Sequence, residues 1–458
     1  MAGARGTVVV FSTSDTIVAI ATPPGRGGIG VVRLSGPEAH ATARRLIAHD
    51  TLLEPRRATF TLVQPKGTVA GDSAIDHVVA TYFPAPASYT GDDVVELSAH
   101  GSPVILRAIV AGAIANGARS AEPGEFTLRA FLNGRIDLMQ AEAVADLIDA
   151  VTPLQARAAF DQLQGTLTRT IGGIDAALFD LIAGLEASVD FPEEGYHFVE
   201  AAHLADALDR LSSRIDALLC DARRGRLIRE GLQIAIAGEP NVGKSSVFNA
   251  LVGASRAIVA DEPGTTRDLV TEMVDLDGLQ VTLIDTAGLR ETANVVESEG
   301  VERARQAQRV SDLTLFVVDR SRPLTADVCY QDVDTKRLIV ANKTDLPAAW
   351  RRDDAVEVSA LTGEGMACLR QRIVEALDVE SLADRPEITN LRHISLVERA
   401  REALRRARTA VVVDGESLSE EFVLADLQEA RSAFEEIAGR RAPEALLEHI
   451  FSRFCIGK

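Results

Sequence analysis

The stretch GEPNVGKSS, residues 238 to 246, constrains the fold of this 458-residue chain more tightly than any other segment. It fits the pattern G-x-x-x-x-G-K-S, follows the strand-like run LQIAIA and precedes the helix-like run SVFNALVG. A loop of this composition between a strand and a helix presents backbone N–H groups to phosphates. In that role Lys244 reaches the β- and γ-phosphates of a nucleotide, and Ser245 holds Mg²⁺. We therefore expect a P-loop domain.

Four further motifs follow in the order typical of guanine-nucleotide sites. PGTTRD, residues 263 to 268, supplies Thr266 as a ligand of Mg²⁺, and DTAG, residues 285 to 288, places Asp285 at the metal shell. NKTD, residues 342 to 345, ends in Asp345, whose carboxylate can accept both N–H donors of the guanine edge. Adenine lacks that donor pair, so the site is expected to select GTP over ATP.

The SAL tripeptide, residues 359 to 361, completes the set by offering a backbone N–H to guanine O6. Gly288 is expected to direct its N–H at the γ-phosphate, and Lys244 and Thr266 are also expected to act in catalysis. The residues predicted to contact the nucleotide are Asn241, Val242, Gly243, Lys244, Ser245, Ser246, Gly264, Thr265, Thr266, Asp285, Thr286, Ala287, Gly288, Asn342, Lys343, Asp345, Ser359, Ala360 and Leu361.

The site departs from Ras-like proteins after the DTAG motif, where Leu289 replaces the glutamine that positions water. Another group must therefore orient water and offset charge. A K⁺ ion is one physical solution, because it can stabilise developing negative charge where an arginine would otherwise act. Asn241 could be one ligand, with backbone carbonyls of residues 260 to 266 as others. The alternative is an asparagine that only caps the loop.

On either side of this domain, the sequence pattern changes between β-rich and helical segments. Short β-rich runs mixed with helical segments fill residues 1 to 135, and helical spacings of Leu, Ile, Ala and Val fill residues 136 to 228 and 379 to 458. Strands alternate with helices between 229 and 378. We expect a multidomain α+β and α/β chain: a small α+β N-terminal domain, a helical domain in two halves, and an inserted Ras-like G domain with a parallel sheet and crossover helices.

Composition excludes several classes of function. The net charge is −19, so we do not expect non-specific electrostatic binding to nucleic acid or to an anionic membrane. Four scattered cysteines form no C-x-x-C pair, which argues against a zinc site or a disulfide framework. We find neither a signal peptide nor a long apolar run, and we expect a cytoplasmic protein with no membrane attachment.

Taken together, these segments resemble the tRNA modification GTPase family MnmE, also called TrmE. The resemblance covers nearly the whole chain and includes the order of the domains. It rests on the GTPase motifs and on DTIVAIATPPGRGGIGVVRLSG (15 to 36), SYTGDDVVELSAHGSPVIL (88 to 106), PGEFTLRAFLNGRIDLMQAEAVADLIDA (123 to 150) and the terminal FCIGK.

The resemblance implies a homodimer formed through the N-terminal domain, which binds a tetrahydrofolate derivative, in its 5,10-methylene or 5-formyl form, as a one-carbon donor. It implies an FAD-containing partner, MnmG or GidA, in a heterotetramer-type complex that binds tRNA mainly through that partner. The complex would add an aminomethyl or carboxymethylaminomethyl group at C5 of the wobble uridine. Pairing of two G domains, dependent on K⁺, would activate hydrolysis.

The resemblance also carries over to particular residues. Folate contacts are implied at Arg33, Glu96, Arg135 and Lys458, since a pterin offers donors to a carboxylate and a glutamate tail favours cations. Glu297 matches the acid that positions water, with Glu291, Glu299 and Glu302 as neighbouring alternatives. The metal ligands expected are Ser245 and Thr266 for Mg²⁺, and Asn241, Ala260, Glu262 and Thr265 for K⁺.

Two questions stay open at the level of sequence. The tail CIGK ends in a charged lysine, which disfavours prenylation, and the amphipathic stretch before it suggests a helix that delivers Cys455 to an interior site. There Cys455 could act as nucleophile or proton donor, or simply pack. The alternative to a modification enzyme is a regulatory or ribosome-assembly GTPase switch without one-carbon chemistry.

Overall fold

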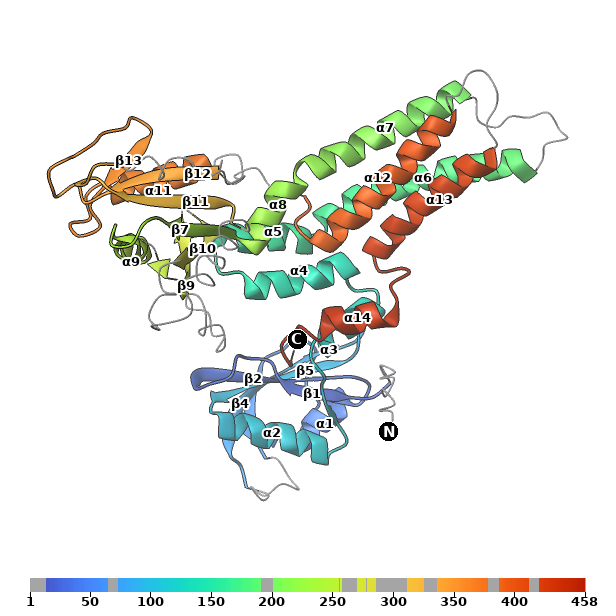
Figure 1. Ribbon diagram of the computed structural model, residues 1–458. Helices are drawn as coiled ribbons and strands as arrows, with labels where there is room; N and C mark the ends of the chain where they lie inside the picture. The colour runs from blue at the N-terminus through green and yellow to red at the C-terminus, as the bar shows by residue number, and fades with distance from the viewer. Residues whose placement is uncertain are drawn as a thin grey trace, which may run out of the picture. The chain divides into compact units, whose positions relative to one another are not determined.

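The computed structural model describes residues 14–64, 73–190, 201–254, 256–257, 270–276, 278–285, 311–324, 336–377, 387–411 and 420–457. The chain forms two compact units (Figure 1). Unit 1 combines Met1–Ala145 with Glu435–Lys458, and unit 2 is Asp146–Phe434. The domain boundaries expected near residues 135, 228 and 378 stay predictions.

A mixed six-stranded sheet forms the core of unit 1, in the order β3-β4-β5-β2-β1-β6. Along β2 the side chains of Val32 and Leu34 are fully buried while Arg33 between them is partly exposed, which is the alternation of a half-buried strand. The elements are β1 (Ile17–Ile20), β2 (Gly27–Ser35), β3 (Thr59–Val63), β4 (Asp76–Phe83), β5 (Val94–Gly101), β6 (Arg119–Ser120), α1 (Ala39–Leu46) and α2 (Pro103–Ala115). The β-rich runs of the N-terminal sequence are confirmed as strands.

The C-terminal segment packs within unit 1. Helix α14 (Glu444–Phe451) contacts α3 (Glu125–Leu132), and Phe451 and Phe454 join a buried cluster with Leu128 and Leu138. The red α14 lies beside α3 in Figure 1. Residues more than three hundred positions apart in sequence therefore share one hydrophobic core.

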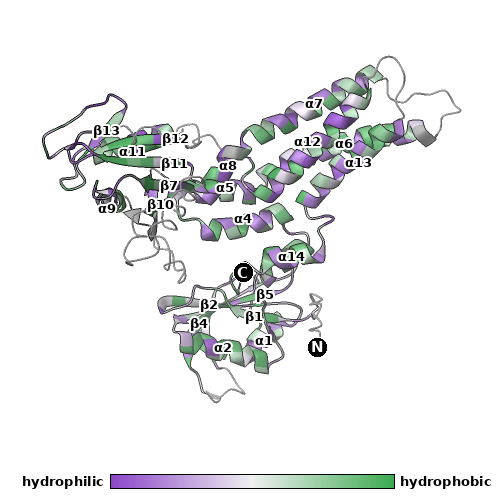
Figure 2. Cartoon of the chain, in the orientation of Figure 1, coloured by the Kyte–Doolittle hydropathy of each residue, from purple (hydrophilic) through white to green (hydrophobic). Residues whose placement is uncertain are grey.

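Long amphipathic helices form the other part of the fold. Five apolar side chains on α7 are buried at spacings of three and four residues, which is the pattern of one helix face: Leu204, Leu208, Leu211, Ile215 and Leu218. Hydrophobic and hydrophilic residues accordingly alternate along α7 and α12 (Figure 2). The helices are α4 (Leu138–Asp149), α5 (Pro153–Leu163), α6 (Thr166–Asp190), α7 (Ala201–Cys220), α8 (Ala222–Glu230), α12 (Leu391–Val411) and α13 (Glu420–Ile437).

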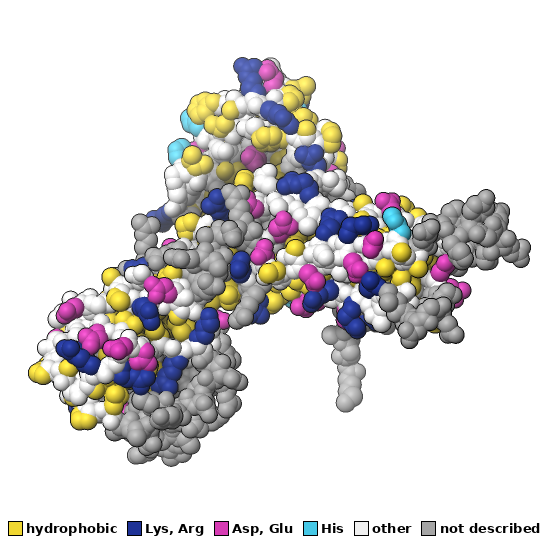
Figure 3. Space-filling model, turned by 90° about the horizontal axis from the view of Figure 1, so that it is seen from above, with side chains coloured by type: hydrophobic (Ala, Val, Ile, Leu, Met, Phe, Trp, Pro, Cys, Tyr) yellow, Lys and Arg dark blue, Asp and Glu magenta, His cyan; other side chains and the backbone are white. Residues whose placement is uncertain are grey.

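Contacts between α7 and α12 confirm that helices from both helical stretches pack in one bundle. The end of the second stretch, Glu435–Lys458, belongs instead to unit 1. Ion pairs add to the packing: Arg408 Nε lies 2.8 Å from Asp209 Oδ1, and Arg431 Nε lies 3.1 Å from Asp175 Oδ1. On the face shown in Figure 3, basic and acidic side chains lie interspersed. None of the helices in the described part of the chain is both long and apolar enough to cross a membrane.

The nucleotide domain contains a seven-stranded sheet in the order β13-β12-β11-β7-β10-β9-β8. The five strands from β13 to β10 are parallel, as predicted. The sequence did not predict β9, which pairs antiparallel with β10, or β8, which pairs antiparallel with β9. The elements are β7 (Leu232–Ala237), β8 (Arg256–Ala257), β9 (Val270–Leu276), β10 (Leu279–Asp285), β11 (Leu313–Asp319), β12 (Lys336–Asn342), β13 (Ala355–Val358), α9 (Lys244–Ala254) and α11 (Met366–Ala376).

Candidate nucleotide site and N-terminal site

The parallel strands bring four predicted motifs to one edge of the sheet. The P-loop follows β7, Asp285 ends β10, the NKTD segment begins at the last residue of β12, and SAL follows β13. Carboxyl ends of parallel strands share an edge, and ligands of open α/β sheets bind there. The topology therefore assembles a site from residues that are more than a hundred positions apart.

The P-loop needs glycine at two positions. Gly238 and Gly243 have φ of +142° and +97°, in the region that side chains of L-residues rarely adopt. A Cβ on Gly238 would collide with the carbonyl oxygen of Val317, and one on Gly243 would collide with the Asn342 amide nitrogen. The loop therefore approaches β11 and the NKTD segment as closely as backbone can.

Polar groups for phosphate and metal gather at the start of α9. Lys244 Nζ donates to the carbonyls of Gly238 at 3.0 Å and Glu239 at 2.8 Å, and Ser245 Oγ donates to Asp285 Oδ2 at 2.8 Å. A hydroxyl beside a buried carboxylate is the oxygen donor set that Mg²⁺ prefers, so these residues fit the ion. Helix α9 also directs its N-terminus, with its positive dipole, at the same place.

The guanine end is organised by the buried side chain of Asn342. Its Nδ2 donates to the carbonyl of Val242 at 2.9 Å, and its Oδ1 accepts the N–H of Ala360 at 3.1 Å. Ser359 Oγ donates to Asp345 Oδ1 at 2.6 Å. Asn342 therefore ties the P-loop to the SAL loop, and Ser359 orients the carboxylate that would read guanine.

Asp319, at the end of β11, is a member of the site that the sequence analysis missed. Its Oδ2 accepts Lys343 Nζ at 2.7 Å, and Lys343 Nζ also donates to the carbonyl of Asn241 at 3.0 Å. Burial would raise the pKa of Asp319, but hydrogen bonds from Lys343 and Ser321 outweigh it and lower that pKa. The available signal was an aspartate ending a predicted parallel strand.

A second polar cluster lies on the sheet of unit 1. Arg33 and Glu96 are cross-strand neighbours on β2 and β5, with Arg33 Nη2 2.8 Å from Glu96 Oε1. The Arg33 guanidinium carbon lies 5.4 Å from the ring centre of Tyr89 and 5.7 Å from that of Phe126, within range of a cation–π contact. The predicted pair is thus adjacent and flanked by aromatic rings, whereas Arg135 is exposed after α3.

Comparison with known proteins decides the family. The model of the MnmE helical domain matches residues 138–455, and that of the GTP-binding protein TrmE N-terminus matches 16–135. Proteins named tRNA modification GTPase MnmE are 45% identical in Koribacter versatilis over 98% of this chain and 100% of the relative, and 41% identical in Aquifex aeolicus over 97% and 100%.

This chain belongs to the MnmE family.

Its relative in Coxiella burnetii, strain RSA 493, is 41% identical over 97% of this chain and 99% of that protein. The G domain of the FeoB iron transporter of T. maritima covers 32% of this chain and 98% of that chain at 25% identity, with a TM-score of 0.23, too low to bear on function. Membership of the MnmE family is therefore established by the full-length relatives.

The C-terminal tail of this MnmE chain is positioned by its backbone. Ile456 forms a bridge with Pro123, Gly457 is buried against the carbonyl of Ile20, and Phe454 is buried. Cys455, however, is exposed. The expectation of an interior Cys455 is therefore wrong for the single chain, because Phe454 and Gly457 face inwards while Cys455 and Ile456 between them are exposed.

Several predicted MnmE site residues lie outside the described part of the chain, and their roles stay predictions. They are Ala260, Glu262, Gly264, Thr265, Thr266, Thr286, Ala287, Gly288, Glu297 and Lys458. Among the described residues, no group of three or more His, Cys, Asp or Glu side chains is arranged to hold a metal ion. Of the predicted K⁺ ligands only Asn241 is described, with φ of 65° and its carbonyl bonded to Lys343.

Proposed function

We propose that this chain hydrolyses GTP and that the hydrolysis supports modification of tRNA. The observation that carries the proposal is the match to full-length relatives named tRNA modification GTPase MnmE, across both domains that flank the nucleotide site. The geometry adds support, since Asn342 links the loop that would bind phosphate to the loop that would bind guanine.

The chain's own residues have separable roles in this proposal. Lys244 turns from the carbonyls of its loop to the β- and γ-phosphates, and Ser245 and Asp285 hold and orient the metal shell. Bound Mg²⁺ supplies charge that offsets the phosphoryl oxygens. Thr266 completes that shell, and Glu297 orients the attacking water. Asn241, with Thr265 and the segment containing Ala260 and Glu262, would form the K⁺ site.

For unit 1 we propose the binding of a tetrahydrofolate derivative, 5,10-methylene or 5-formyl, at the cluster of Arg33 and Glu96. A carboxylate fixed by a cation can accept the paired donors of a pterin, and flanking rings can stack on it. Arg135 and Lys458 would bind the glutamate tail. The group transferred would be aminomethyl or carboxymethylaminomethyl, at C5 of the wobble uridine.

The proposed assembly is a homodimer that acts in the cytoplasm with an FAD-dependent partner, MnmG or GidA. Together they would form a heterotetramer-type complex. The net charge of −19 supports a division of labour in which tRNA binds mainly through the partner.

The test is mass spectrometry of wobble-uridine nucleosides in tRNA from cells that lack this protein. We expect C5-aminomethyl-type uridines to disappear, to return with the intact gene, and to stay absent with Asp285→Ala. Asp354→Asn, on an exposed residue of the same unit, is the control that should restore them. An unchanged nucleoside profile in the deleted cells would refute the proposal and favour a regulatory or ribosome-assembly switch.

A further inference from the structure

The carboxylate of Asp319 is buried and fully engaged at the edge of the nucleotide site. Its Oδ1 accepts the N–H of Ser321 at 2.9 Å and the Ser321 hydroxyl at 2.6 Å, while its Oδ2 accepts Lys343 Nζ at 2.7 Å. The residue as a whole is 5% exposed. Ser321 holds one carboxylate oxygen of Asp319 and Lys343 holds the other, so the oxygen that meets Lys343 points in a defined direction.

Lys343 extends this connection to the P-loop. The same ammonium group donates to the carbonyl of Asn241 at 3.0 Å. Both Lys343 and Asn241 have left-handed backbone, with φ of 71° and 65°, a conformation that costs energy for any residue with a side chain. The bridge Asp319–Lys343–Asn241 therefore holds two costly loop conformations next to each other.

The position of this bridge gives it a consequence for recognition. Lys343 lies between Asn342, which bonds the P-loop and SAL, and Asp345, which would read the guanine edge. We propose that Asp319 is a positioning residue for guanine specificity: by fixing Lys343 against the P-loop, it sets Asp345 relative to the phosphates. This inference rests on the proposed function, since it takes a guanine nucleotide as the ligand.

The physical reason is the strength of a charge-assisted bond inside a partly buried site. Lys343 is 29% exposed, so without its carboxylate partner the ammonium gains more by turning to water. The NKTD loop then samples conformations in which Asp345 does not meet both guanine donors. Bonds to charged groups of this kind correspond to about 10- to 100-fold in affinity.

The experiment compares GDP with inosine diphosphate on the full chain carrying Asp319→Asn. Inosine lacks the 2-amino group, so it offers Asp345 only one of the two guanine donors. The relevant ratio is the dissociation constant of inosine diphosphate divided by that of GDP, and it measures how well Asp345 reads the guanine edge. We expect GDP to bind about 10- to 100-fold more weakly, inosine diphosphate to lose less, and the ratio to fall. A general loss of phosphate binding would instead weaken both nucleotides equally, because Lys244, Ser245 and Asp285 make contacts separate from those of Asp319.

Two control variants match this change. Arg322→Gln removes an exposed cation whose Nε lies 3.6 Å from Asp319 Oδ2 but which makes no described bond to the P-loop. Asp354→Asn makes the same chemical change on an exposed aspartate paired with Arg352. Both should keep the affinity and the ratio of the unaltered chain. Trp350, the single tryptophan, donates to the Asp319 carbonyl at 3.0 Å, so its emission reports whether the local fold survives.

The outcomes separate the possibilities. An unchanged GDP affinity in Asp319→Asn, or an equal loss for both nucleotides, would overturn the positioning role. If Trp350 emission shows a lost local fold, Lys343→Met takes its place: a fallen ratio supports the bridge, and an unchanged ratio overturns it. If the unaltered chain binds no guanine nucleotide, the proposed function itself is refuted. If the unaltered chain binds GDP and both Asp319→Asn and Lys343→Met bind it normally, only the positioning role of Asp319 is refuted.

Discussion

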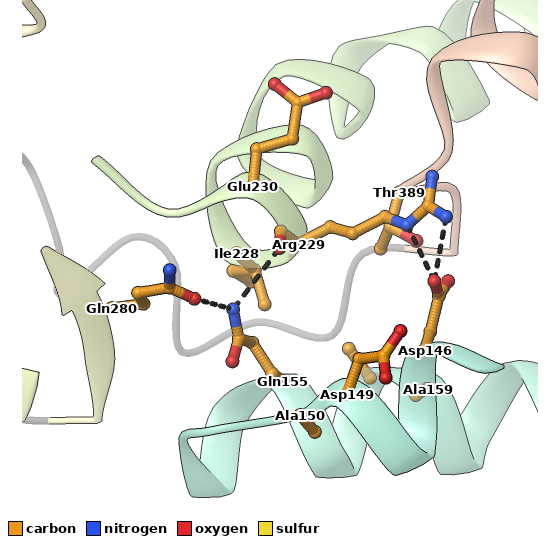
Figure 4. Close-up of a pocket in the computed structure, with 11 residues that line it drawn as sticks. Asp146, Asp149, Ala150, Gln155, Ala159, Ile228, Arg229, Glu230, Gln280 and Thr389 are labelled. Carbon is orange, nitrogen blue, oxygen red and sulfur yellow. Dashed lines mark hydrogen bonds and ion pairs between the residues drawn. The ribbon is translucent and has the colours of Figure 1, made fainter. Parts of the chain in front are cut away.

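Replacing Gln155 by leucine tests how the helical part of unit 2 is joined to the nucleotide domain. Gln155 is buried at the start of α5, where its amide oxygen accepts the N–H groups of Val151 and Thr152 at 3.0 and 3.2 Å. Its amide nitrogen donates to Gln280 Oε1 at 2.7 Å and to the Arg229 carbonyl at 3.2 Å (Figure 4). One side chain therefore joins α5, the end of α8 and strand β10.

The magnitude follows from these four bonds. Leucine keeps the approximate volume but leaves each partner without its bond, and a buried group left unsatisfied costs about 1–3 kcal/mol. A cavity of about 270 Å³ adjoins Gln155 and can admit water to some of those groups. We therefore expect a total loss of about 2–4 kcal/mol in the local free energy of opening, below the sum of four full penalties.

The assay is hydrogen exchange of the backbone amides in α5 and β10. We expect Gln155→Leu to speed exchange in both elements, by about 30-fold or more, because the lost bonds belong to each of them. Gln371→Leu is the control, since this side chain makes an exposed bond to Glu375 at 3.1 Å and should change exchange little. Acceleration below about twofold in α5 and β10 would refute the reasoning.

Three further predictions concern the P-loop, the buried carboxylate of Glu125 and the K⁺ site. Gly243→Ala should abolish measurable GDP binding in a titration, because φ of Gly243 is +97° and an added Cβ would meet the Asn342 amide. Gly253→Ala in α9 is the control: its Cβ would point into open space, so this variant should bind GDP normally. Normal GDP binding by Gly243→Ala would contradict the geometry. Burial opposes ionisation of Glu125, but hydrogen bonds from Arg119 and Arg129 lower its pKa below the usual 4.5. The contribution of Glu125 to stability is thus complete above pH 4.5 and is lost as pH falls through the lower folded pKa. Glu125→Gln should therefore flatten the acid limb of a plot of melting temperature against pH. An unaltered acid limb refutes this prediction. Replacing K⁺ by Na⁺ should strongly lower GTP turnover while leaving GDP affinity nearly intact; equal turnover in both salts removes the K⁺ site.

Local motifs were predicted well because the residues that give them their chemistry are adjacent in the sequence. Lys244 and Ser245 follow a glycine-rich loop, and the loop, its strand and its helix all lie within one short segment. The five parallel strands could also be predicted, since each is rich in Val, Ile, Leu and Ala and most end at a recognisable nucleotide motif. The hairpin strand β9 was missed because its sequence VTEMVDL alternates and carries charges, and short segments of that kind suit several structures.

Residue order established that this chain would contain a P-loop domain set within helices, and its motifs established which nucleotide that domain suits. The tertiary structure alone decided that Asp319 meets Lys343, that Gln155 reaches Gln280, and that the tail turns Cys455 outwards. The reason is physical. A motif acts through neighbours in the chain, whereas these contacts depend on sheet order, strand register and helix packing, which arise only when distant apolar faces are buried together.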